Sequence, residues 1–400
     1  MTTNRPIWGY TLPAALLLMA PFDILASLAM DIYLPVVPAM PGLLGTSPFV
    51  IQLTLSLYMM MLGVGQVLFG PISDRIGRRP ILLTGAFLFA IASLGAASSS
   101  TAIPFVTFRL LEAVGASAAL VATFATVRDV YADRPEGVVI YGLFSSIMAF
   151  VPALGPIVGA LIADHFGWRA IFIVLAALSV PAGLNAAFRW RETRPESQTT
   201  QRRSVMPIFS SLPFWTYTLA FSAAMGTFFV FFSTAPRVLI DRAGYSEIRF
   251  SITFATVAVV MIVVTRFAKA FVARWGIAGS AARGMGLLLC GAILLSLGEV
   301  LGSPSFASFI VPMWVMAAGI VLTASVSANG ALAGFNDIAG SAVAFYFCIQ
   351  SLIVGTVGTL ATTMLGGDTA WPLIGYAAMM AALVSAGLAL LQLRDQSSKQ

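Results

Sequence analysis

Charged residues are scarce in this chain, because only 10% of its 400 residues are Asp, Glu, Lys or Arg while 59% are hydrophobic. A soluble protein of this length carries about 25% charged residues. The scarcity and a mean hydropathy of +0.93 together predict an all-helical, polytopic membrane protein. The net charge of +6 does not indicate nucleic acid as a partner, because the basic residues fall between apolar runs and form no long stripe.

Cysteine and histidine are nearly missing as well. The two cysteines, Cys290 and Cys348, lie far apart in apolar runs, and the single histidine, His165, has no cysteine near it in sequence. This pattern predicts no disulfide framework and no zinc site, and we expect neither a metal nor a cofactor. The chain also has no G-x-x-x-x-G-K-[ST] loop, which argues against an ATP-driven pump. Its first apolar run is expected to be a retained helix rather than a signal peptide.

Long apolar runs are abundant by contrast. A helix needs about 20 apolar residues to cross the hydrocarbon core, and twelve segments meet that length. They lie at roughly 11–34, 48–70, 79–98, 103–126, 136–162, 168–188, 210–236, 249–270, 281–301, 306–328, 339–364 and 370–393.

The basic residues between these segments predict the orientation. With both termini in the cytoplasm, 17 of the 22 basic residues fall on the inside, four outside and one, Arg109, within a span. The positive-inside rule favours this register. The inside set is Arg5, Arg75, Arg78, Arg79, Arg128, Arg134, Arg189, Arg191, Arg194, Arg202, Arg203, Arg266, Lys269, Arg274, Arg283, Arg394 and Lys399, and the outside set is Arg169, Arg237, Arg242 and Arg249.

The chain divides into two halves at its one long polar connector, "RWRETRPESQTTQRRS" at 189–204, whose composition is typical of a flexible linker. We expect a six-helix bundle at 1–188, a cytoplasmic linker at 189–209 and a second bundle at 210–400. An internal repeat agrees with this division: "GPISDRIG" at 70–77 aligns with "KAFVARWG" at 269–276, keeping an arginine and a glycine in register. Duplicated six-helix halves are typical of transporters with a substrate site near the midplane.

The loop "GPISDRIGRRPILL" after the second span resembles the signature of the major facilitator superfamily. Its glycines suit a tight connection. The resemblance implies that Asp74 and the arginines pair across helix ends as a cytoplasmic latch. The residues of this predicted latch are Gly70, Asp74, Arg75, Gly77 and Arg78.

Two further motifs narrow the resemblance. The fourth span carries "RLLEAVGASAA" from Arg109, which is similar to the intramembrane arginine motif of the superfamily, and the fifth carries "ALGPIVGA", similar to an antiporter motif with Gly155, Pro156 and Gly159. These three residues are expected to set a bend and close helix packing. Together the motifs favour the twelve-span drug/proton antiporter family.

Longer segments are similar to the phenicol exporters within that family, which confer resistance to chloramphenicol and florfenicol. They include "PFDILASLAMDIYLP", "ATVRDVYADRPEGVVIYGLFSS" and "GTFFVFFSTAPRVLI", and the resemblance runs essentially end to end. It implies a monomeric, multi-pass protein of the bacterial inner membrane that exchanges a phenicol-type drug for protons. The chain departs from the family pattern at Glu112, where glutamine is common, at Ala160, in place of a glycine, and at Ala273, where an acid is lost.

Three acids and one base are expected at membrane depth, where a charge is expensive. At a rise of about 1.5 Å per residue, Asp23 lies near the midplane, Asp31 near the periplasmic rim, and Arg109 at a height between them. We interpret Asp23 as the proton carrier, Arg109 as its electrostatic partner, and Glu112 as a tuning or second protonatable group. A fixed charge pair locking spans one and four is the alternative. Asp31 is expected to face water or to cap the helix end, and a role in proton coupling is the alternative.

The drug is expected to meet aromatic and polar side chains on four spans. "TFFVFFST" in the seventh span offers aromatic rings, although packing is the alternative for each, and "AFYFCIQS" in the eleventh offers a phenol and an amide. An uptake symporter or metabolite exporter, a membrane enzyme and a receptor remain rivals, because fold does not determine function. The candidate substrate residues are Asp23, Ser27, Arg109, Phe228, Phe231, Phe345, Tyr346 and Gln350.

Overall fold

The computed structural model describes residues 8–131, 134–194, 204–302, 304–335 and 338–397. Within these ranges the chain forms helices and no strands. It separates into two compact units, Met1–Gln201 and Arg202–Gln400. Part of the predicted linker, 195–203, lies outside the described residues, as do the predicted inside residues Arg5, Arg202, Arg203 and Lys399.

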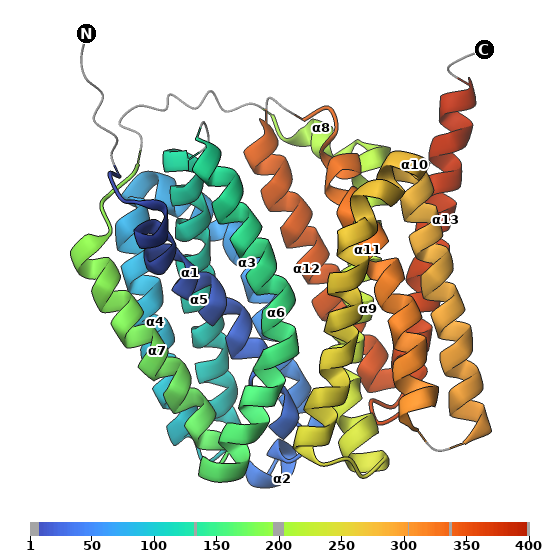
Figure 1. The fold of residues 1–400 in the computed structure, drawn as a ribbon, viewed down its shortest axis with the longest axis horizontal. Helices are drawn as coiled ribbons and strands as arrows, with labels where there is room; N and C mark the ends of the chain where they lie inside the picture. Colours follow the sequence, from blue (N-terminus) through green and yellow to red (C-terminus); the bar gives the residue numbers. More distant parts are fainter. Residues whose placement is uncertain (1–7, 132–133, 195–203, 303, 336–337, 398–400) are drawn as a thin grey trace. The chain divides into compact units, whose positions relative to one another are not determined.

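The first unit is a bundle of long helices (Figure 1). Helix α4 packs against α5 and α7, α3 packs against α5, and α1 packs against α5, α6 and α7. A 3-10 turn, η1 (Leu34–Val36), and the short α2 (Met40–Leu43) connect α1 to α3. The long helices are α1 (Leu12–Asp31), α3 (Pro48–Ile76), α4 (Arg78–Ser98), α5 (Ala102–Tyr131), α6 (Pro135–Phe166) and α7 (Trp168–Arg189).

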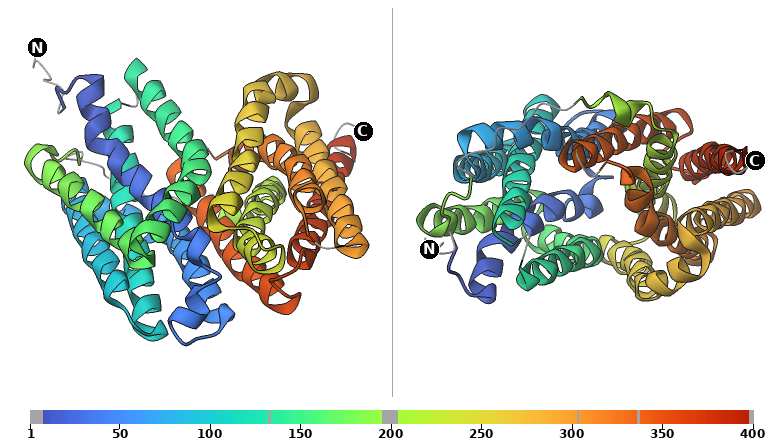
Figure 2. Two further views of the ribbon diagram at one scale, coloured as in Figure 1. Left: turned by 60° about the horizontal axis from the view of Figure 1, so that its bottom comes forward. Right: turned by 90° about the horizontal axis from the view of Figure 1, so that it is seen from above.

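The second unit is built around α9, which contacts α11, α12 and α13, while α10 packs against α11 and α13 (Figure 2). Two π-helical segments, η2 (Arg237–Arg242) and η3 (Phe306–Ile310), adjoin α9 and α11. The helices of this unit are α8 (Met206–Phe209), α9 (Leu212–Pro236), α10 (Glu247–Leu301), α11 (Val311–Leu332), α12 (Ala339–Met364) and α13 (Trp371–Ser397).

The twelve predicted spans all coincide with helices. Ten helices of the described residues are long and apolar enough to cross a membrane. One of them is α10, whose 55 residues contain two predicted spans. The two spans are separated by a kink at Gly276, which has a non-helical conformation (φ 67°, ψ −177°). The fifth predicted span corresponds to α6, which is not among these ten helices. Within α6, the segment 150–166 is a shorter apolar helix.

The internal repeat is visible in the backbone. Gly77 ends α3 with φ 118°, and Gly276, 199 positions later, has φ 67°. Positive φ favours glycine because a Cβ atom would clash there. Both glycines therefore turn the chain between two consecutive spans, at equivalent places in the two halves.

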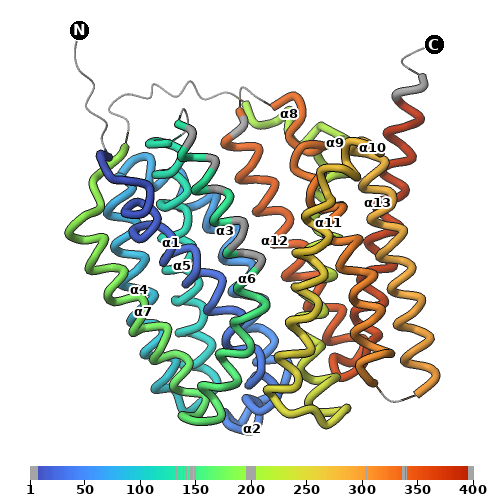
Figure 3. The backbone as a smooth tube through the Cα atoms, viewed as in Figure 1, coloured from blue at the N-terminus to red at the C-terminus, as the bar shows by residue number. Residues whose placement is uncertain are grey.

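The start and the end of the first unit meet at one end of the bundle. The Tyr10 hydroxyl donates to the Arg189 carbonyl at 2.6 Å, and the indole N–H of Trp8 donates to the Arg191 carbonyl at 3.1 Å. The tube in Figure 3 shows residues before α1 lying beside the end of α7. A chain that returns to its starting side has crossed an even number of times, as six spans require.

Candidate functional site

The intramembrane arginine, Arg109, is enclosed within the first unit. Only 1% of its surface is exposed, and the guanidinium carbon lies 5.2 Å from the ring centre of Tyr33, 4.9 Å from that of Tyr58 and 5.6 Å from that of Phe172. Aromatic faces attract a cation, and the attraction strengthens away from water. Rings from α3, from α7 and from the turn after α1 thus surround one charge.

Arg109 has a different ionic partner from the one expected. Its Nη1 atom pairs with Glu112, one turn further along α5, and also donates to the Ala29 carbonyl of α1 at 3.1 Å. The described residues show no ion pair between Arg109 and Asp23. Ala29 lies six residues beyond Asp23, or about 9 Å along the helix. The arginine is therefore held at the level of the C-terminal end of α1.

Glu112 is held from two sides. Its Oε1 atom accepts a hydrogen bond of 2.6 Å from Ser93 of α4, while Oε2 faces Arg109. Buried charges need both a counter-charge and hydrogen bonds, and Glu112 receives both. Ser93 was missed by sequence reasoning, because a lone serine in an apolar run carries no signal of its partner.

Asp23 is a buried carboxylate without a visible partner. It is 2% exposed, and its Oδ2 atom has no hydrogen-bond partner among the described residues. Ser27 follows one helical turn later, which places it on the same face of α1, and it is partly exposed. The structure thus separates Asp23 from the Arg109–Glu112 pair, in which the Nε and Nη2 atoms of Arg109 are also buried without a hydrogen-bond partner among the described residues.

Asp31 is buried rather than facing water. It is the last residue of α1, but only 6% of its surface is exposed. The position of Asp31 at the end of α1 agrees with the expectation from the sequence, but the expected exposure of its side chain to water is not seen. The reason is α6, which approaches so closely that a Cβ atom on Gly155 would lie 2.9 Å from the Asp31 Cβ.

The glycines of the antiporter motif bring α6 against α1. A Cβ atom on Gly159 would lie 1.8 Å from the Ile32 carbonyl oxygen, a distance that no real side chain tolerates. Pro156 lies between the two glycines inside α6. These residues thus contact the end of the helix that carries Asp23 and Asp31.

The signature loop carries a dense charge network at the other end of the unit. Arg78 pairs with Asp74 at 2.5 Å and with Asp129 of α5 at 2.9 Å, and it donates to the Ser73 hydroxyl at 2.7 Å. The Arg78 side chain is buried although the loop lies at a helix boundary. Asp129 was not expected from the sequence, because it follows Arg109 by twenty residues with no local motif.

Glu192, in the connector after α7, completes this network. Its carboxylate accepts hydrogen bonds from the backbone N–H groups of Arg78 (2.8 Å), Arg79 (3.1 Å), Thr193 (3.0 Å) and Arg194 (2.9 Å). Burial alone would raise the pKa of Glu192, but these four hydrogen bonds outweigh it and hold the pKa below its usual value. The first residues of the linker are thereby attached to the start of α4.

The remaining latch residues differ in their contacts. A Cβ on Gly77 would lie 2.5 Å from a Glu192 oxygen, so this glycine makes room for the carboxylate. Gly70, by contrast, lies inside α3 with open space around it, so its expected role in a tight connection is not seen. Arg75 exposes its side chain, and its carbonyl accepts a hydrogen bond from Arg194.

Three of the candidate phenylalanines of the second unit take part in packing. Phe231 is buried between Phe254, at 5.1 Å with nearly parallel rings, and Phe309, at 5.8 Å. Phe228 also lies beside Phe254, at 6.3 Å. Phe345 lies edge-on to Phe209 of α8, at 5.0 Å.

Tyr346 and Gln350 are brought together one turn apart on α12. The Tyr346 hydroxyl and the Gln350 amide nitrogen are both buried without a hydrogen-bond partner among the described residues. Phe221 of α9 stacks on the Tyr346 ring at 5.1 Å, a neighbour that sequence reasoning missed. Buried polar groups are normally satisfied, so the absence of partners makes these two atoms candidates for contact with a ligand.

The cysteines and the histidine show no site of their own. Cys290 and Cys348 are free thiols, and the described residues contain no cluster of His, Cys, Asp or Glu that could hold a metal. The His165 Nδ1 atom lies 2.9 Å from the Leu161 carbonyl on an exposed helix end.

Comparisons with known proteins agree with this architecture. The chain is 47% identical over 387 residues to a chloramphenicol resistance protein of Pseudomonas aeruginosa, covering 96% of this chain and 92% of the relative. It is 31% identical over 239 residues to the multidrug resistance protein MdtL of Salmonella heidelberg, covering 59% and 60% of the two chains.

The fold also matches a solved transporter. The crystal structure of a D-xylose–proton symporter superposes with a TM-score of 0.74 over 94% of this chain and 97% of that one, at 16% identity. The family model of the Major Facilitator Superfamily matches residues 22–359. With its twelve spans in two repeated halves, its signature loop and its buried arginine, the chain belongs to the Major Facilitator Superfamily and is a multi-pass membrane transporter, not an enzyme.

Proposed function

We propose that the protein exports phenicol antibiotics, chloramphenicol and florfenicol among them, in exchange for protons. The single observation that carries the coupling is Asp23, a buried carboxylate without a hydrogen-bond partner at Oδ2. A charged carboxylate without a partner is costly to bury. A group in this position changes its protonation whenever its access to water changes.

The similarity to a chloramphenicol resistance protein supports the choice of drug. In the first unit, Asp23 and Ser27 offer a carboxylate and a hydroxyl to a neutral, amphiphilic drug. In the second unit, Tyr346 and Gln350 offer a phenol and an amide, which suit the hydroxyl, amide, nitro and sulfone groups of phenicols. Phe221 and Phe228, both half-buried, are aromatic surfaces for the phenyl ring of the drug.

Arg109 and Glu112 have a positioning role in this proposal. Their ion pair, hydrogen-bonded to Ala29 and Ser93, fixes the C-terminal part of α1 against α4 and α5. The first unit therefore contains one acid that is ion-paired and hydrogen-bonded, Glu112, and one buried carboxylate, Asp23, whose Oδ2 atom has no hydrogen-bond partner among the described residues. Only Asp23 is proposed to carry the proton, with Asp31 as a second acid that stays in α1–α6 packing.

Alternating access then links the two fluxes. Drug entering from the cytoplasm favours release of the Asp23 proton to that side, and protonation from the periplasm favours release of the drug. Each entering proton gains about 2.3 kcal/mol per 100 mV of membrane potential. We propose that this exchange takes place in the bacterial inner membrane, with both termini in the cytoplasm and with a monomer as the transporting species.

Drug-dependent proton movement in proteoliposomes tests the proposal. Adding chloramphenicol or florfenicol to vesicles that contain the protein should move protons opposite to the drug, and Asp23→Asn should abolish this movement while Asp31→Asn retains most of it. Proton movement in the same direction as the drug would identify an uptake symporter instead. Full drug-driven exchange in Asp23→Asn would remove Asp23 from the mechanism.

A further inference from the structure

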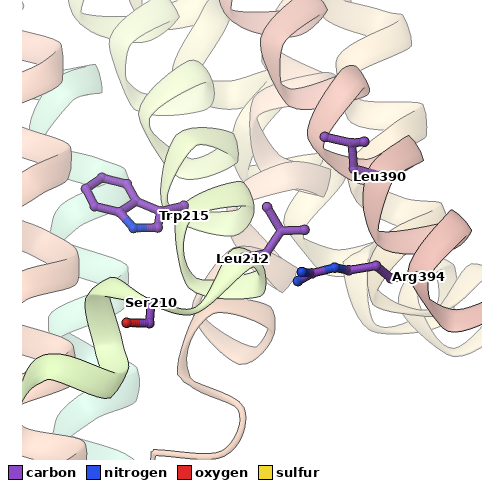
Figure 4. Close-up of a pocket in the computed structure, with 5 residues that line it drawn as sticks. All are labelled: Ser210, Leu212, Trp215, Leu390 and Arg394. Carbon is purple, nitrogen blue, oxygen red and sulfur yellow. The ribbon is translucent and has the colours of Figure 1, made fainter. Parts of the chain in front are cut away.

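The second unit contains an open cavity of about 450 Å³ where the start of α9 meets the end of α13 (Figure 4). Both ends of the unit contribute to it: residues from the α8–α9 turn and the first turn of α9 on one side, and residues from the last turns of α13 on the other. Its lining residues are Ser210, Leu212, Trp215, Leu390 and Arg394. We call this cavity the α9–α13 groove.

The walls of the groove are apolar and accessible from outside the unit. Leu390 is 53% exposed and Trp215 is 36% exposed, on helices whose outer faces meet lipid. The Trp215 indole N–H donates to the Phe209 carbonyl at 2.9 Å, which fixes the ring at the boundary between α8 and α9. Tryptophan is enriched at this depth, where the hydrocarbon gives way to the headgroups.

The polar end of the groove carries one basic side chain, that of Arg394. Arg394 follows Leu390 by one helical turn, and in Figure 4 its side chain extends toward that of Leu212. Helix α9 begins at Leu212, so the positive end of its dipole also faces this region. Ser210 adds a hydroxyl, and none of the lining residues is acidic.

This combination suits one kind of ligand. A guanidinium presents five N–H donors, enough to bind a phosphate alongside other partners. A phosphate next to an apolar, laterally accessible wall at headgroup depth is the chemistry of a phospholipid. A soluble anion would not need the leucine and tryptophan surfaces.

We propose that the α9–α13 groove is a binding site for an anionic phospholipid. The phosphate lies on Arg394 and Ser210, and the glycerol and upper acyl chain lie along Leu212, Trp215 and Leu390. With the proposed orientation, the lipid comes from the cytoplasmic leaflet. The headgroup links the first turn of α9 to the last turns of α13, so it fastens the beginning of the second unit to its end.

Native mass spectrometry of the full-length protein tests the site, with phosphatidylglycerol as the probe and phosphatidylcholine as the zwitterionic comparison. Arg394→Gln should weaken phosphatidylglycerol binding by about fivefold, the effect of one basic residue at an anionic surface. Arg266→Gln removes an exposed arginine elsewhere in the same unit and should leave binding unchanged. Equal loss in both variants, or no loss in Arg394→Gln, would overturn the proposal.

A second comparison distinguishes a lipid from a free phosphate. Glycerol 1-phosphate carries the headgroup chemistry without acyl chains and should not displace phosphatidylglycerol at equal concentration. Leu390→Gln should weaken lipid binding without changing the thermal unfolding of the protein, because the residue is exposed. Displacement by glycerol 1-phosphate, or unchanged lipid binding in Leu390→Gln, would show that the apolar walls take no part and would refute the lipid assignment.

Discussion

The backbone N–H of Arg78 donates a hydrogen bond of 2.8 Å to the carboxylate of Glu192, 114 residues further along the chain. The same carboxylate accepts three more backbone N–H groups, so one side chain joins the signature loop to the first residues of the linker. The latch of the first unit is therefore more than an Asp–Arg pair, and its linker contact can be tested separately from transport.

Glu192→Ala should free the start of the linker. Loss of a helix-end carboxylate costs about 1 kcal/mol, and the backbone at Thr193 and Arg194 loses its acceptor. We expect faster trypsin cleavage after Arg191 than in the parent protein. Asp164→Ala, which removes an exposed acid near His165, should leave the cleavage rate unchanged; equal rates for Glu192→Ala and the parent would contradict the anchoring role.

The Glu192 contact should also depend on pH in one direction. Because its pKa is held below the usual value, the charged form stabilises the folded state above the unfolded pKa of about 4.3, and this contribution disappears as pH falls through the lower folded pKa. The difference in unfolding temperature between parent and Glu192→Ala should be constant from about pH 5 to 8 and shrink below about 4.3. A difference that grows on acidification would rule out this account.

The Arg109–Glu112 pair should behave as a structural unit. Glu112→Ala leaves a buried guanidinium without its counter-charge, which costs about 3 to 5 kcal/mol, so the thermal stability of the purified protein should fall strongly. Replacing both residues with apolar ones, Arg109→Met with Glu112→Leu, should recover much of that loss. If the double variant is no more stable than Glu112→Ala, the two residues do not compensate each other.

Gly159 and Gly142 form a matched pair on α6. Gly159→Ala places a Cβ atom 1.8 Å from the Ile32 carbonyl oxygen, whereas an alanine at Gly142 meets no atom within 4 Å. We expect Gly159→Ala to lower the unfolding temperature and the transport rate, since α6 must move away from α1. Gly142→Ala should be neutral or stabilising by up to about 1 kcal/mol, because alanine favours helix over glycine. Similar behaviour of the two variants would mean that the α1–α6 approach is not tight in the working protein.

Tyr346 and Tyr376 separate ligand binding from folding. The Tyr376 hydroxyl donates to the Ser222 carbonyl at 2.8 Å, whereas that of Tyr346 has no partner among the described residues. Tyr376→Phe should therefore lose about 1 kcal/mol of stability. Tyr346→Phe should keep the parent's unfolding temperature and weaken drug binding several-fold, as measured by equilibrium binding of radiolabelled chloramphenicol. Unchanged binding in Tyr346→Phe would exclude its hydroxyl from the drug site.

The positions of the spans followed from the sequence because membrane insertion is a local property. Each crossing needs its own run of apolar residues and satisfies its backbone internally, so runs such as 48–70 and 168–188 indicate helices without reference to their neighbours. The role of Gly77 was also readable, because the tight connection between α3 and α4 has positive φ at this residue, a conformation that favours glycine. The same holds for the 55-residue α10, in which Gly276 lies between the predicted spans 249–270 and 281–301.

The partners of the charged residues were decided by tertiary structure. Height along a helix places Arg109 between Asp23 and Asp31, but the rotation of each helix determines which side chain it meets, and rotation depends on packing against every neighbour. Glu112 lies one turn from Arg109 on the same helix, so that pair is local, whereas packing between helices buried Asp31 under α6 and left Asp23 without an ion pair among the described residues. The sequence by itself determined which residues lie in the membrane and near which end, while the fold decided which charges meet across helices, because such contacts need directions in space that a one-dimensional pattern does not contain.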